Sequence, residues 1–516
     1  MIEFDYDLQS LQEMRKAVSR AKEAQVKYQQ FSQEQVDRIV KHVAEAAYRQ
    51  SEYLARLAVE ETKMGIVEHK KIKNDLGSMG VYESIKDEKT VGVIRDDYAK
   101  KMTEIAYPFG VIAGITPTTN PTSTAIFKTL ISLKTQNAIV FSPHPSAVKC
   151  TVEALEICNR AAIEAGAPEG LIGWISKPTM ATTTELMRHR EVNLILATGG
   201  GGLVRAAYSS GKPAYGVGPG NVPVYVDRTA NIKQAMKMIV DSKTFDNSTI
   251  CATEQAVVVH KDIKELAVRE LRNNGAYFLD ESEKERIEKI ISPSIGKINP
   301  AIVGRSAETI ANMAGIIIPA GTRLLIAEET KIGKEIPFSL EKLSPIFALY
   351  TAYDEEEAKR ICIDLLNLGG RGHSFSLHTN DERIVQMFGA EMPVSRIMVN
   401  TLSSIGAAGA TTGLTPSFTL GCGSFGGNIT SDNVTARHLI NIKRVAYGMK
   451  EVEIPQPSQT IQYHIQESAN DDGIDAMIEQ VMKEVDLKSK SVSHQAVSEM
   501  VKNVIQQYKN QTLGGI

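Results

Sequence analysis

Short, mostly apolar runs alternate with longer amphipathic stretches between residues 108 and 226, and this pattern constrains the fold more than any other feature. The runs lie at residues 108–115, 138–141, 170–175, 192–197 and 224–226. Apolar runs of this length are typical of strands buried on both faces, and parallel strands need helix-sized connections between them. The sequence therefore predicts an α/β fold with a doubly wound parallel sheet, and the alternation continues to about residue 400.

Helices are expected before this region, and short strands of a separate arm on either side of it. From about residue 8 to 65 the apolar side chains keep helical spacing, and Ser32 with Gln35 has the form of a capping box. Two alternating segments, 90–95 and 102–107, predict strands of the arm, and residues 438–445 predict a closing strand.

Length and composition exclude several classes of protein. A chain of 516 residues is too long for one hydrophobic core, so two or three domains are expected. The net charge of −3, with both signs interspersed, argues against nucleic-acid binding. The N-terminus has no apolar signal core and no run of about 18 apolar residues exists, so neither export nor a membrane span is expected. Five scattered cysteines without a CxxC pair favour a reduced, cytoplasmic location and no metal site.

Cys251 stands out because it follows a polar turn, Asp246-Asn-Ser248, and precedes an apolar run at 256–260. Cysteine is strongly nucleophilic once ionised, and free backbone N–H groups at a turn would stabilise its thiolate. A buried, inert cysteine is the alternative, because that is the commoner fate of this residue. The turn alone leaves both interpretations open.

Four glycines at 199–202 follow the apolar run at 192–197 and open a short predicted helix. Backbone N–H groups at such a helix start can approach a pyrophosphate, although the run is not a GxGxxG pattern. A tight turn also needs glycine, so the run by itself does not decide between the two.

Six motifs, in this order, resemble the aldehyde dehydrogenase superfamily, and in particular its CoA-acylating branch. They are Thr116-Pro-Thr-Thr-Asn-Pro121, Ala214-Tyr-Gly-Val-Gly-Pro-Gly-Asn221, Phe245-Asp-Asn-Ser-Thr-Ile-Cys251, Glu341-Lys-Leu-Ser-Pro345, Gly372-His373 and Thr419-Leu-Gly-Cys-Gly-Ser-Phe-Gly-Gly-Asn428. The resemblance covers roughly residues 8–448. It is greatest to acylating succinate-semialdehyde dehydrogenases and to the aldehyde dehydrogenase half of bifunctional aldehyde–alcohol dehydrogenases.

The resemblance implies roles for individual residues. Cys251 is similar to the nucleophile, and Asn120 to the asparagine whose amide, with the Cys251 N–H, forms the oxyanion hole. His373 matches a site histidine of the acylating branch, with a structural histidine as the alternative. The implied cofactor-binding residues are Thr116, Pro117, His144, Gly199, Gly200, Gly218 and Glu341, of which Glu341 would hold the nicotinamide ribose. The implied cofactor is NAD, with NADP as the alternative, and coenzyme A is the implied co-substrate.

Two departures from the hydrolytic members of that superfamily are informative. Those enzymes carry a glutamate near position 216 that activates water, whereas this chain has Gly216-Val-Gly-Pro there. Without such a base water attacks a thioester slowly, and a thiol nucleophile wins. Pro143-His-Pro-Ser146 replaces the Lys-Pro-Ser-Glu that grips the adenosine ribose, which leaves the choice between NAD and NADP open.

The implied reaction converts an aldehyde, CoA and NAD(P)+ reversibly into acyl-CoA and NAD(P)H through a thioacyl group on Cys251. Acetaldehyde or propionaldehyde is the default substrate, because sulfoacetaldehyde or succinate semialdehyde would need a basic residue in the pocket. A hydrolytic aldehyde dehydrogenase and an inactive scaffold of the same fold are the competing interpretations. A third interpretation is a relative of glutamyl-phosphate reductase, but the stretch Gly421–Asn428 does not suggest it.

The expected domains are a cofactor-binding domain at 1–244, with 89–106 in a bridging arm, a catalytic domain at 245–425 and a bridging strand at 426–448. A homo-oligomer, dimer or tetramer, is expected. Residues 451–516 read as a linker and a helical tail, in which two stretches, 474–485 and 497–508, keep apolar side chains at helical spacing. The last helix resembles the encapsulation peptides of enzymes in bacterial microcompartments, so a shell protein is a candidate partner. Packing on its own domain or a sister subunit is the alternative.

Overall fold

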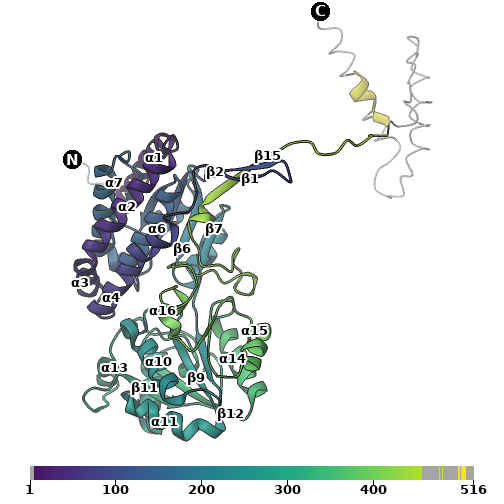
Figure 1. Ribbon diagram of the computed structural model, residues 1–516. Helices are drawn as coiled ribbons and strands as arrows, with labels where there is room; N and C mark the ends of the chain where they lie inside the picture. Colours follow the sequence, from purple (N-terminus) through teal and green to yellow (C-terminus); the bar gives the residue numbers. More distant parts are fainter. Residues whose placement is uncertain are drawn as a thin grey trace, which may run out of the picture. The chain divides into compact units, whose positions relative to one another are not determined.

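The structure is a computed structural model that describes residues 5–455, 476, 479, 495, 498–499 and 501–506 (Figure 1). Its contacts divide the chain into two units, Met1–Tyr447 and Gly448–Ile516. The first unit holds every residue that the sequence assigns to the site, and all the strands of the described residues.

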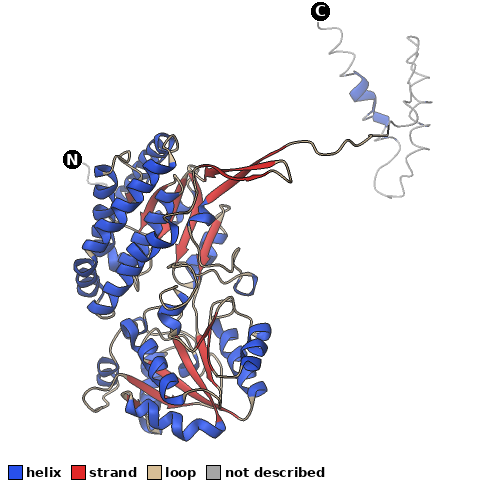
Figure 2. Cartoon of the chain, viewed as in Figure 1, coloured by secondary structure: helices blue, strands red, loops and turns tan. Residues whose placement is uncertain are grey.

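A parallel sheet, whose strands are red in Figure 2, forms the centre of the first half of the chain. It has five strands in the order β5-β4-β3-β6-β7. Its strands are β3 (Val111–Ile115), β4 (Ala138–Ser142), β5 (Ile172–Trp174), β6 (Val192–Thr198) and β7 (Ala214–Val217). β3 and β4 are buried along their whole length, which is why the sequence shows them as unbroken apolar runs. All four pairings are parallel, as predicted.

The chain changes direction across this sheet between β3 and β6. From β3 it continues outward through β4 and β5 and then returns to β6, on the other side of β3. Ile115 pairs with Ser142 of β4 and with Ala197 of β6, so the three strands end almost level. In open α/β sheets ligands bind beyond the carboxyl ends of the strands at such a crossover.

Helices surround this sheet, and the first three lie in the region of about residues 8–65 where the sequence predicts helices, whereas the fourth lies beyond it. They are α1 (Tyr6–Tyr28), α2 (Gln33–Arg49), α3 (Ser51–Thr62), α4 (Val67–Asp75), α5 (Val81–Ile85), α6 (Pro121–Lys134), α7 (Val148–Glu164), α8 (Met180–Arg188) and α9 (Gly201–Tyr208). The capping box of Ser32 and Gln35 is present at the start of α2. Every residue of α6 is buried, because this helix runs through the middle of the first core.

A seven-stranded parallel sheet forms the second half, in the order β10-β11-β12-β9-β8-β13-β14. Its strands are β8 (Val222–Val226), β9 (Glu254–His260), β10 (Ala276–Phe278), β11 (Leu324–Glu328), β12 (Ile346–Ala352), β13 (Phe375–His378) and β14 (Ile397–Val399). Its helices are α10 (Ile232–Thr244), α11 (Lys264–Asn273), α12 (Glu281–Ile291), α13 (Ala307–Met313), α14 (Glu355–Gly369), α15 (Glu382–Glu391) and α16 (Ser403–Ala407).

Side chains of this second sheet alternate between two separate cores. Val257 and Val259 of β9 pack in the core formed with α10 and α11, whereas Ala256 and Val258 pack in the core formed with α14. Successive residues of a strand point to opposite faces, so the two cores cover the two faces of the sheet. The second sheet is therefore wound on both faces.

The change from the first sheet to the second comes between β7 and β8. α10 consequently packs on the second sheet. The sequence analysis instead includes α10 in the cofactor-binding domain, which it ends at residue 244. How cofactor binding and catalysis divide between the two sheets stays a prediction.

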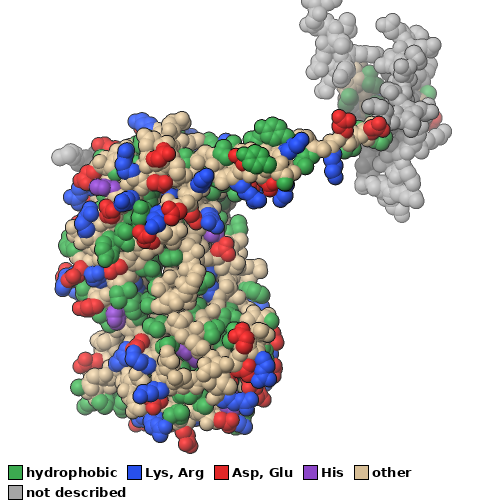
Figure 3. All heavy atoms as spheres, viewed as in Figure 1, with side chains coloured by type: hydrophobic (Ala, Val, Ile, Leu, Met, Phe, Trp, Pro, Cys, Tyr) green, Lys and Arg blue, Asp and Glu red, His purple; other side chains and the backbone are tan. Residues whose placement is uncertain are grey.

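An antiparallel arm joins β1 (Gly92–Asp97), β2 (Met102–Pro108) and β15 (Ile440–Ala446), in the order β1-β2-β15. These strands agree with the three short strands predicted from the sequence. Apolar side chains are exposed along the arm (Figure 3), and among them are Val93, Tyr98, Tyr107, Ile442, Val445 and Tyr447.

The tail of the second unit is described at few positions. Residues 498, 499 and 501–506 are helical, within the second stretch predicted as a helix. Of the apolar stripe predicted there, Val501, Val504 and Ile505 are described, while Val497, Met500 and Tyr508 lie outside the described residues. The predicted helix at 474–485 is described only at residues 476 and 479.

Candidate active site

Cys251 lies in a strained turn between α10 and β9. The 3₁₀ turn Phe245–Ser248 follows α10, and its residues Asp246, Asn247 and Ser248 have φ angles of 51°, 51° and 70°. Non-glycine residues rarely adopt this left-handed region, and such strain is retained where the surrounding structure enforces it. Cys251 is half-buried, whereas the other four cysteines are buried.

His373 is brought to Cys251 from a position 122 residues further along the chain. The Sγ atom of Cys251 lies 3.1 Å from Nε2 of His373. The other ring nitrogen, Nδ1, lies 2.9 Å from the Oγ atom of Ser374, at the start of β13. One ring nitrogen is therefore held by the serine hydroxyl while the other faces the thiol.

Both members of this pair are neutral in the protein without ligands. Burial, and then the nearby Glu341 carboxylate, raise the pKa of the Cys251 thiol to about 12. Burial, and then the Arg396 cation, lower the pKa of His373 to about 3. The proton therefore rests on sulfur, next to an unprotonated imidazole nitrogen at hydrogen-bonding distance. The separation meets the geometric requirement for a general base, whereas the low pKa of His373 in the site without ligands works against the transfer.

Arg396 fixes the backbone around His373. Arg396 is 4% exposed, and its guanidinium donates to the carbonyl oxygens of His373 at 2.8 Å and Ser431 at 3.0 Å. It also donates to Oδ1 of Asn433 at 2.7 Å and to the carbonyl oxygen of Gly421. Every one of these acceptors is neutral, so Arg396 ties His373 to the glycine-dense loop rather than pairing with an acid.

Glu341 and Gly220 lie against the backbone of Cys251. The Gly220 N–H donates to Oε1 of Glu341 at 2.8 Å. A Cβ atom on Gly220 would lie 1.8 Å from the carbonyl oxygen of Cys251, so only glycine fits there. Gly218, nearby in the same loop, donates its N–H to the thiol of Cys422. The predicted cofactor residues Gly218 and Glu341 therefore lie close to the backbone of Cys251, through their neighbour Gly220.

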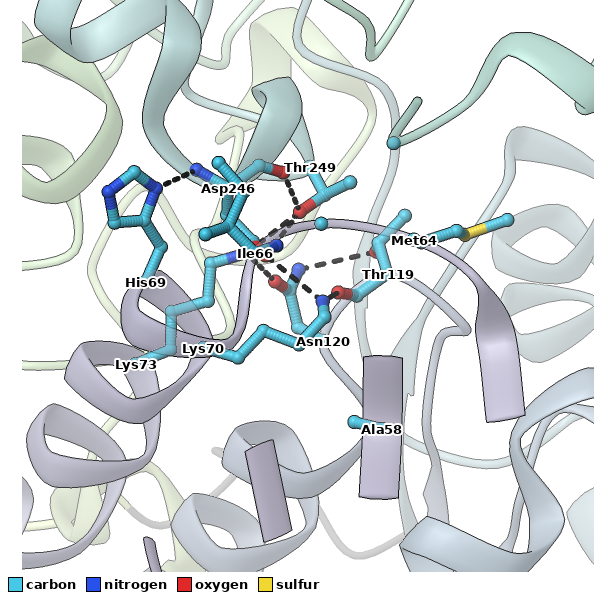
Figure 4. Close-up of polar contacts among 12 residues, drawn as sticks. Ala58, Met64, Ile66, His69, Lys70, Lys73, Thr119, Asn120, Asp246 and Thr249 are labelled. Atoms are coloured by element: carbon cyan, nitrogen blue, oxygen red, sulfur yellow. Dashed lines mark hydrogen bonds and ion pairs between the residues drawn. The ribbon is translucent and has the colours of Figure 1, made fainter. Parts of the chain in front are cut away.

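Asn120 is connected to the nucleophile turn by a lysine. Asn120 is the residue immediately before α6, and its Oδ1 accepts a hydrogen bond from Nζ of Lys73 at 2.6 Å (Figure 4). The same Nζ donates to Oγ1 of Thr249 at 2.9 Å, two residues before Cys251. The structure therefore links the predicted oxyanion amide to the turn that carries the thiol.

The remaining predicted cofactor residues meet at the carboxyl edge of the five-stranded sheet. Thr116 and Pro117 follow β3, His144 follows β4, and Gly199 and Gly200 follow β6. His144 is exposed, and its Nδ1 accepts the N–H of Ser146 at 3.1 Å.

Features of this edge fit a dinucleotide cofactor. The buried hydroxyls of Thr116 and Thr118 have no hydrogen-bond partner within the described residues, so polar groups are available for a ligand. A Cβ atom added to Gly200 or Gly218 would meet nothing within 4 Å, which leaves room close to the backbone. Gly200 caps the N-terminus of α9, where backbone N–H groups favour phosphate.

Gly216 does not point at the nucleophile. A Cβ atom there would lie 2.8 Å from a methyl carbon of Val204 and 3.1 Å from the ring of Tyr208, both on α9. A glutamate at position 216 would therefore be directed into α9. The sequence comparison with hydrolytic enzymes points to position 216 as the place of their water-activating glutamate. In this structure a side chain at residue 216 would face α9 and not Cys251, so a base at that residue would not reach the thioester.

Sequence reasoning missed the charged groups behind the site, which are Lys70, Lys73 and Arg396. The signal for the two lysines was α4 itself, whose nine residues contain few apolar side chains. A helix without an apolar stripe that packs one face against the protein must present polar groups inward, and the buried residues of α4 are Lys70, Lys73 and Asn74. No comparable signal marked Arg396.

Among the described residues no helix is long and apolar enough to cross a membrane. Within the same residues no group of three or more His, Cys, Asp or Glu side chains is placed to hold a metal ion.

Comparison with known proteins places this geometry in a family. The sequence profile of the aldehyde dehydrogenase family matches residues 5–436, and the chain belongs to this family. It is 49% identical over 439 residues to the bifunctional aldehyde-alcohol dehydrogenase AdhE of Escherichia coli strain K12. The aligned region covers 84% of this chain and 49% of that protein. The chain thus spans about half the length of the first curated relatives it matches.

Two solved structures identify the branch of the family. An acetylating aldehyde dehydrogenase from Geobacillus thermoglucosidasius is 54% identical, with a TM-score of 0.87 over 88% of this chain and 100% of that one. A propionaldehyde dehydrogenase from Rhodopseudomonas palustris, with bound CoA and an acylated cysteine, is 30% identical, with a TM-score of 0.76 over 84% and 97% of the two chains. The chain is therefore similar to CoA-acylating aldehyde dehydrogenases in sequence and in fold.

Proposed function

We propose that the protein is a CoA-acylating aldehyde dehydrogenase, which converts a short aldehyde, CoA and NAD(P)+ reversibly into acyl-CoA and NAD(P)H. The observation that carries the proposal is the Cys251 thiol 3.1 Å from the unprotonated His373 imidazole, within a fold similar to acylating enzymes. A bound nicotinamide cofactor would supply the hydride acceptor, held by Glu341 and by the residues at the edge of the five-stranded sheet.

The first step is attack of Cys251 sulfur on the aldehyde carbonyl. Because the resting thiol keeps its proton, His373 Nε2 takes that proton as the carbon–sulfur bond forms. The aldehyde oxygen becomes an oxyanion, and the Asn120 amide with the Cys251 N–H donates hydrogen bonds to it. Removing one such donor commonly costs about 3–4 kcal/mol of transition-state stabilisation. Loss of hydride from the thiohemiacetal then leaves a thioacyl group on Cys251.

CoA thiol is the proposed acceptor of this acyl group. His373 first releases to water the proton that it took from Cys251, which is the one proton released per turnover. As the CoA sulfur attacks, the neutral His373 accepts the CoA thiol proton; the bond from Cys251 sulfur to the acyl carbon breaks, and the departing Cys251 thiolate takes that proton back. Exchange of one thioester for another is nearly balanced in free energy, so both directions are open. The acylated cysteine of the Rhodopseudomonas structure supports this order of events by similarity.

The surroundings of Cys251 favour an uncharged acyl chain. An apolar cluster packs against Cys251 and consists of Phe245, Ile250, Ala252, Met398, Ile405, Ala407 and Leu420. Two buried cations, Lys73 and Arg396, lie behind the site, and each already donates to three or more protein oxygens. All three N–H donors of Lys73 and four of the five of Arg396 already bind protein oxygens, which leaves little to pair with a carboxylate or sulfonate on the substrate. We therefore propose acetaldehyde or propionaldehyde rather than succinate semialdehyde or sulfoacetaldehyde.

A panel of four aldehydes tests this proposal. Acetaldehyde, propionaldehyde, succinate semialdehyde and sulfoacetaldehyde are each incubated with NAD or NADP, with and without CoA, and both cofactor reduction and acyl-CoA are measured. The proposal predicts cofactor reduction that depends on CoA in equimolar amount, greatest with the two uncharged aldehydes. Reduction without CoA, with formation of free acid, would establish the hydrolytic alternative. No turnover with any aldehyde, and no alkylation of Cys251 by iodoacetamide, would establish the scaffold alternative.

Two surfaces outside the site are proposed to bind other chains. The exposed apolar side chains of the arm support a homo-oligomer, dimer or tetramer, in which a second copy covers them.

The tail supports docking on another protein, since Val504 is exposed and a short isolated helix is marginal in water. A microcompartment shell is the partner to test. A fluorescent protein fused to residues 451–516 would stay diffuse in cells with matching compartments if the tail were not a targeting segment.

A further inference from the structure

Two lysines and one aspartate lie buried behind the nucleophile turn, and their charges do not balance. The side chains of Lys70, Lys73 and Asp246 are 3%, 2% and 0% exposed. Buried charges are costly unless they are paired, so one carboxylate would need only one lysine. The second cation therefore calls for an explanation.

Lys73 directs all three of its N–H donors at oxygen atoms. They reach Oδ1 of Asn120 at 2.6 Å, Oγ1 of Thr249 at 2.9 Å and the carboxylate of Asp246 (Figure 4). An ammonium group donates only, so it must face the oxygen of the Asn120 amide and not its nitrogen. The NH₂ group of Asn120 is thereby turned away from Lys73. Among the described residues it makes one long hydrogen bond, of 3.3 Å, to Oγ1 of Thr119, which leaves the other N–H of the amide without a partner there.

The same cluster holds the strained turn that precedes Cys251. The Asp246 carboxylate accepts hydrogen bonds from the Ile66 N–H at 2.7 Å, from Lys70 at 3.0 Å and from Thr249 at 2.5 Å. Lys70 also donates to the carbonyl oxygen of Thr119 at 2.9 Å. α4 therefore contacts both the loop that carries Asn120 and the turn that carries Cys251.

We infer that Lys73 is a positioning residue for oxyanion stabilisation, which keeps the N–H groups of Asn120 facing the substrate oxygen and at a fixed place relative to Cys251. This rests on the proposed function, because it assumes that Asn120 donates to the oxyanion. The ammonium also draws electron density from the amide oxygen, which makes the amide N–H a stronger donor. Burial lowers the pKa of Lys73 to about 7 against the attraction of Asp246, so the ammonium form, and with it this orientation of the Asn120 amide, is favoured below that pH.

The test is a double-mutant cycle of Lys73→Met and Asn120→Ala, measured as kcat/KM for aldehyde oxidation in the presence of CoA. Lys73→Met keeps the length of the side chain and leaves Asp246 paired with Lys70. If Lys73 acts through Asn120, each single variant loses activity, by up to about 10²–10³-fold, and the double variant is no worse than Asn120→Ala alone. The loss in Lys73→Met falls on kcat, since substrate binding does not need the oxyanion donor.

Two further measurements separate positioning from loss of structure. Alkylation of Cys251 by iodoacetamide forms no oxyanion, so its rate in Lys73→Met should stay near that of the parent. Lys70→Met removes a buried charge from the same helix but leaves the Asn120 amide contact, so its loss should multiply with that of Asn120→Ala. Lys73→Gln, whose amide can face Asn120 in either orientation, should lie between the parent and Lys73→Met.

Losses that multiply in the Lys73–Asn120 double variant would overturn the inference, as would alkylation that slows in parallel with catalysis. If Asn120→Ala alone kept full activity, the fault would lie in the proposed role of Asn120 and not in Lys73.

Discussion

Replacing Gly220 by alanine tests how tightly the nucleophile is held. A Cβ atom on residue 220 would lie 1.8 Å from the carbonyl oxygen of Cys251, whereas real Cβ atoms essentially never come within 3.0 Å of a heavy atom. The two backbones must therefore separate by about 1.2 Å. Gly220 has little room to move away from Cys251, because its carbonyl oxygen packs closely against Gly370. A Cβ atom on Gly370 would lie only 1.9 Å from that oxygen.

A displacement of this size has a calculable consequence. A misplacement of about 1 Å at a reacting group costs roughly 10²-fold in rate, so kcat/KM of Gly220→Ala should fall by at least that factor. Overpacking of a tightly packed region typically costs about 1–3 kcal/mol, so the protein should still fold. CoA-dependent cofactor reduction gives the first quantity, and urea unfolding gives the second.

Gly389→Ala is the matched control. Gly389 lies inside α15, and a Cβ atom there would meet nothing within 4 Å. Alanine is favoured over glycine in a helix by about 1 kcal/mol, so this variant should be fully active and equally or more stable. Gly220→Ala with more than half of the parent activity would refute the tight packing of Gly220 against Cys251.

Other predictions concern the pair of catalytic groups, pH and the tail. Cys251→Ser should keep at most a few per cent of activity, while Cys158→Ser, at a buried thiol of α7, should remain active. His373→Ala should lower kcat/KM by about 10²–10⁴-fold, measured against alkylation of Cys251 as a check that the thiol is still accessible. Burial lowers the pKa of His378 from 6.5 to about 4, so folding disfavours its charged form and stability is lost as pH falls from 6.5 toward 4. Between about pH 7 and pH 5 the parent should lose about 2 kcal/mol more free energy of unfolding than His378→Phe. Removing residues 451–516 should leave kcat/KM within about twofold, because the first unit contains the whole site; a large loss would show that the tail belongs to the enzyme's own fold.

The sequence predicted the strands well where burial leaves a simple pattern. β3 and β4 are buried on both faces and read as continuous apolar runs, and the capping box of α2 is a local signal. The turn before Cys251 was likewise visible as a polar turn, because Asp, Asn and Ser are turn-forming residues.

The site was predicted as a set of residues but not as a geometry. Cys251 and His373 were assigned by resemblance, whereas their 3.1 Å separation depends on long-range packing that no local pattern encodes. The direction of Gly216 toward α9 depends on the pleat of β7, which the motif does not reveal. Lys73 and Arg396 were missed because charged residues are normally exposed, and only tertiary structure shows that these two are buried.

Acyl transfer to Cys251 is the most direct test of the central claim. The protein is incubated with acetyl-CoA or propionyl-CoA without reduced cofactor, digested, and examined by mass spectrometry for the peptide that carries Cys251. The account predicts one acyl group on Cys251, release of free CoA in equal amount, and neither in Cys251→Ser. An unmodified Cys251, or an acyl group on Cys422 in its place, would contradict it.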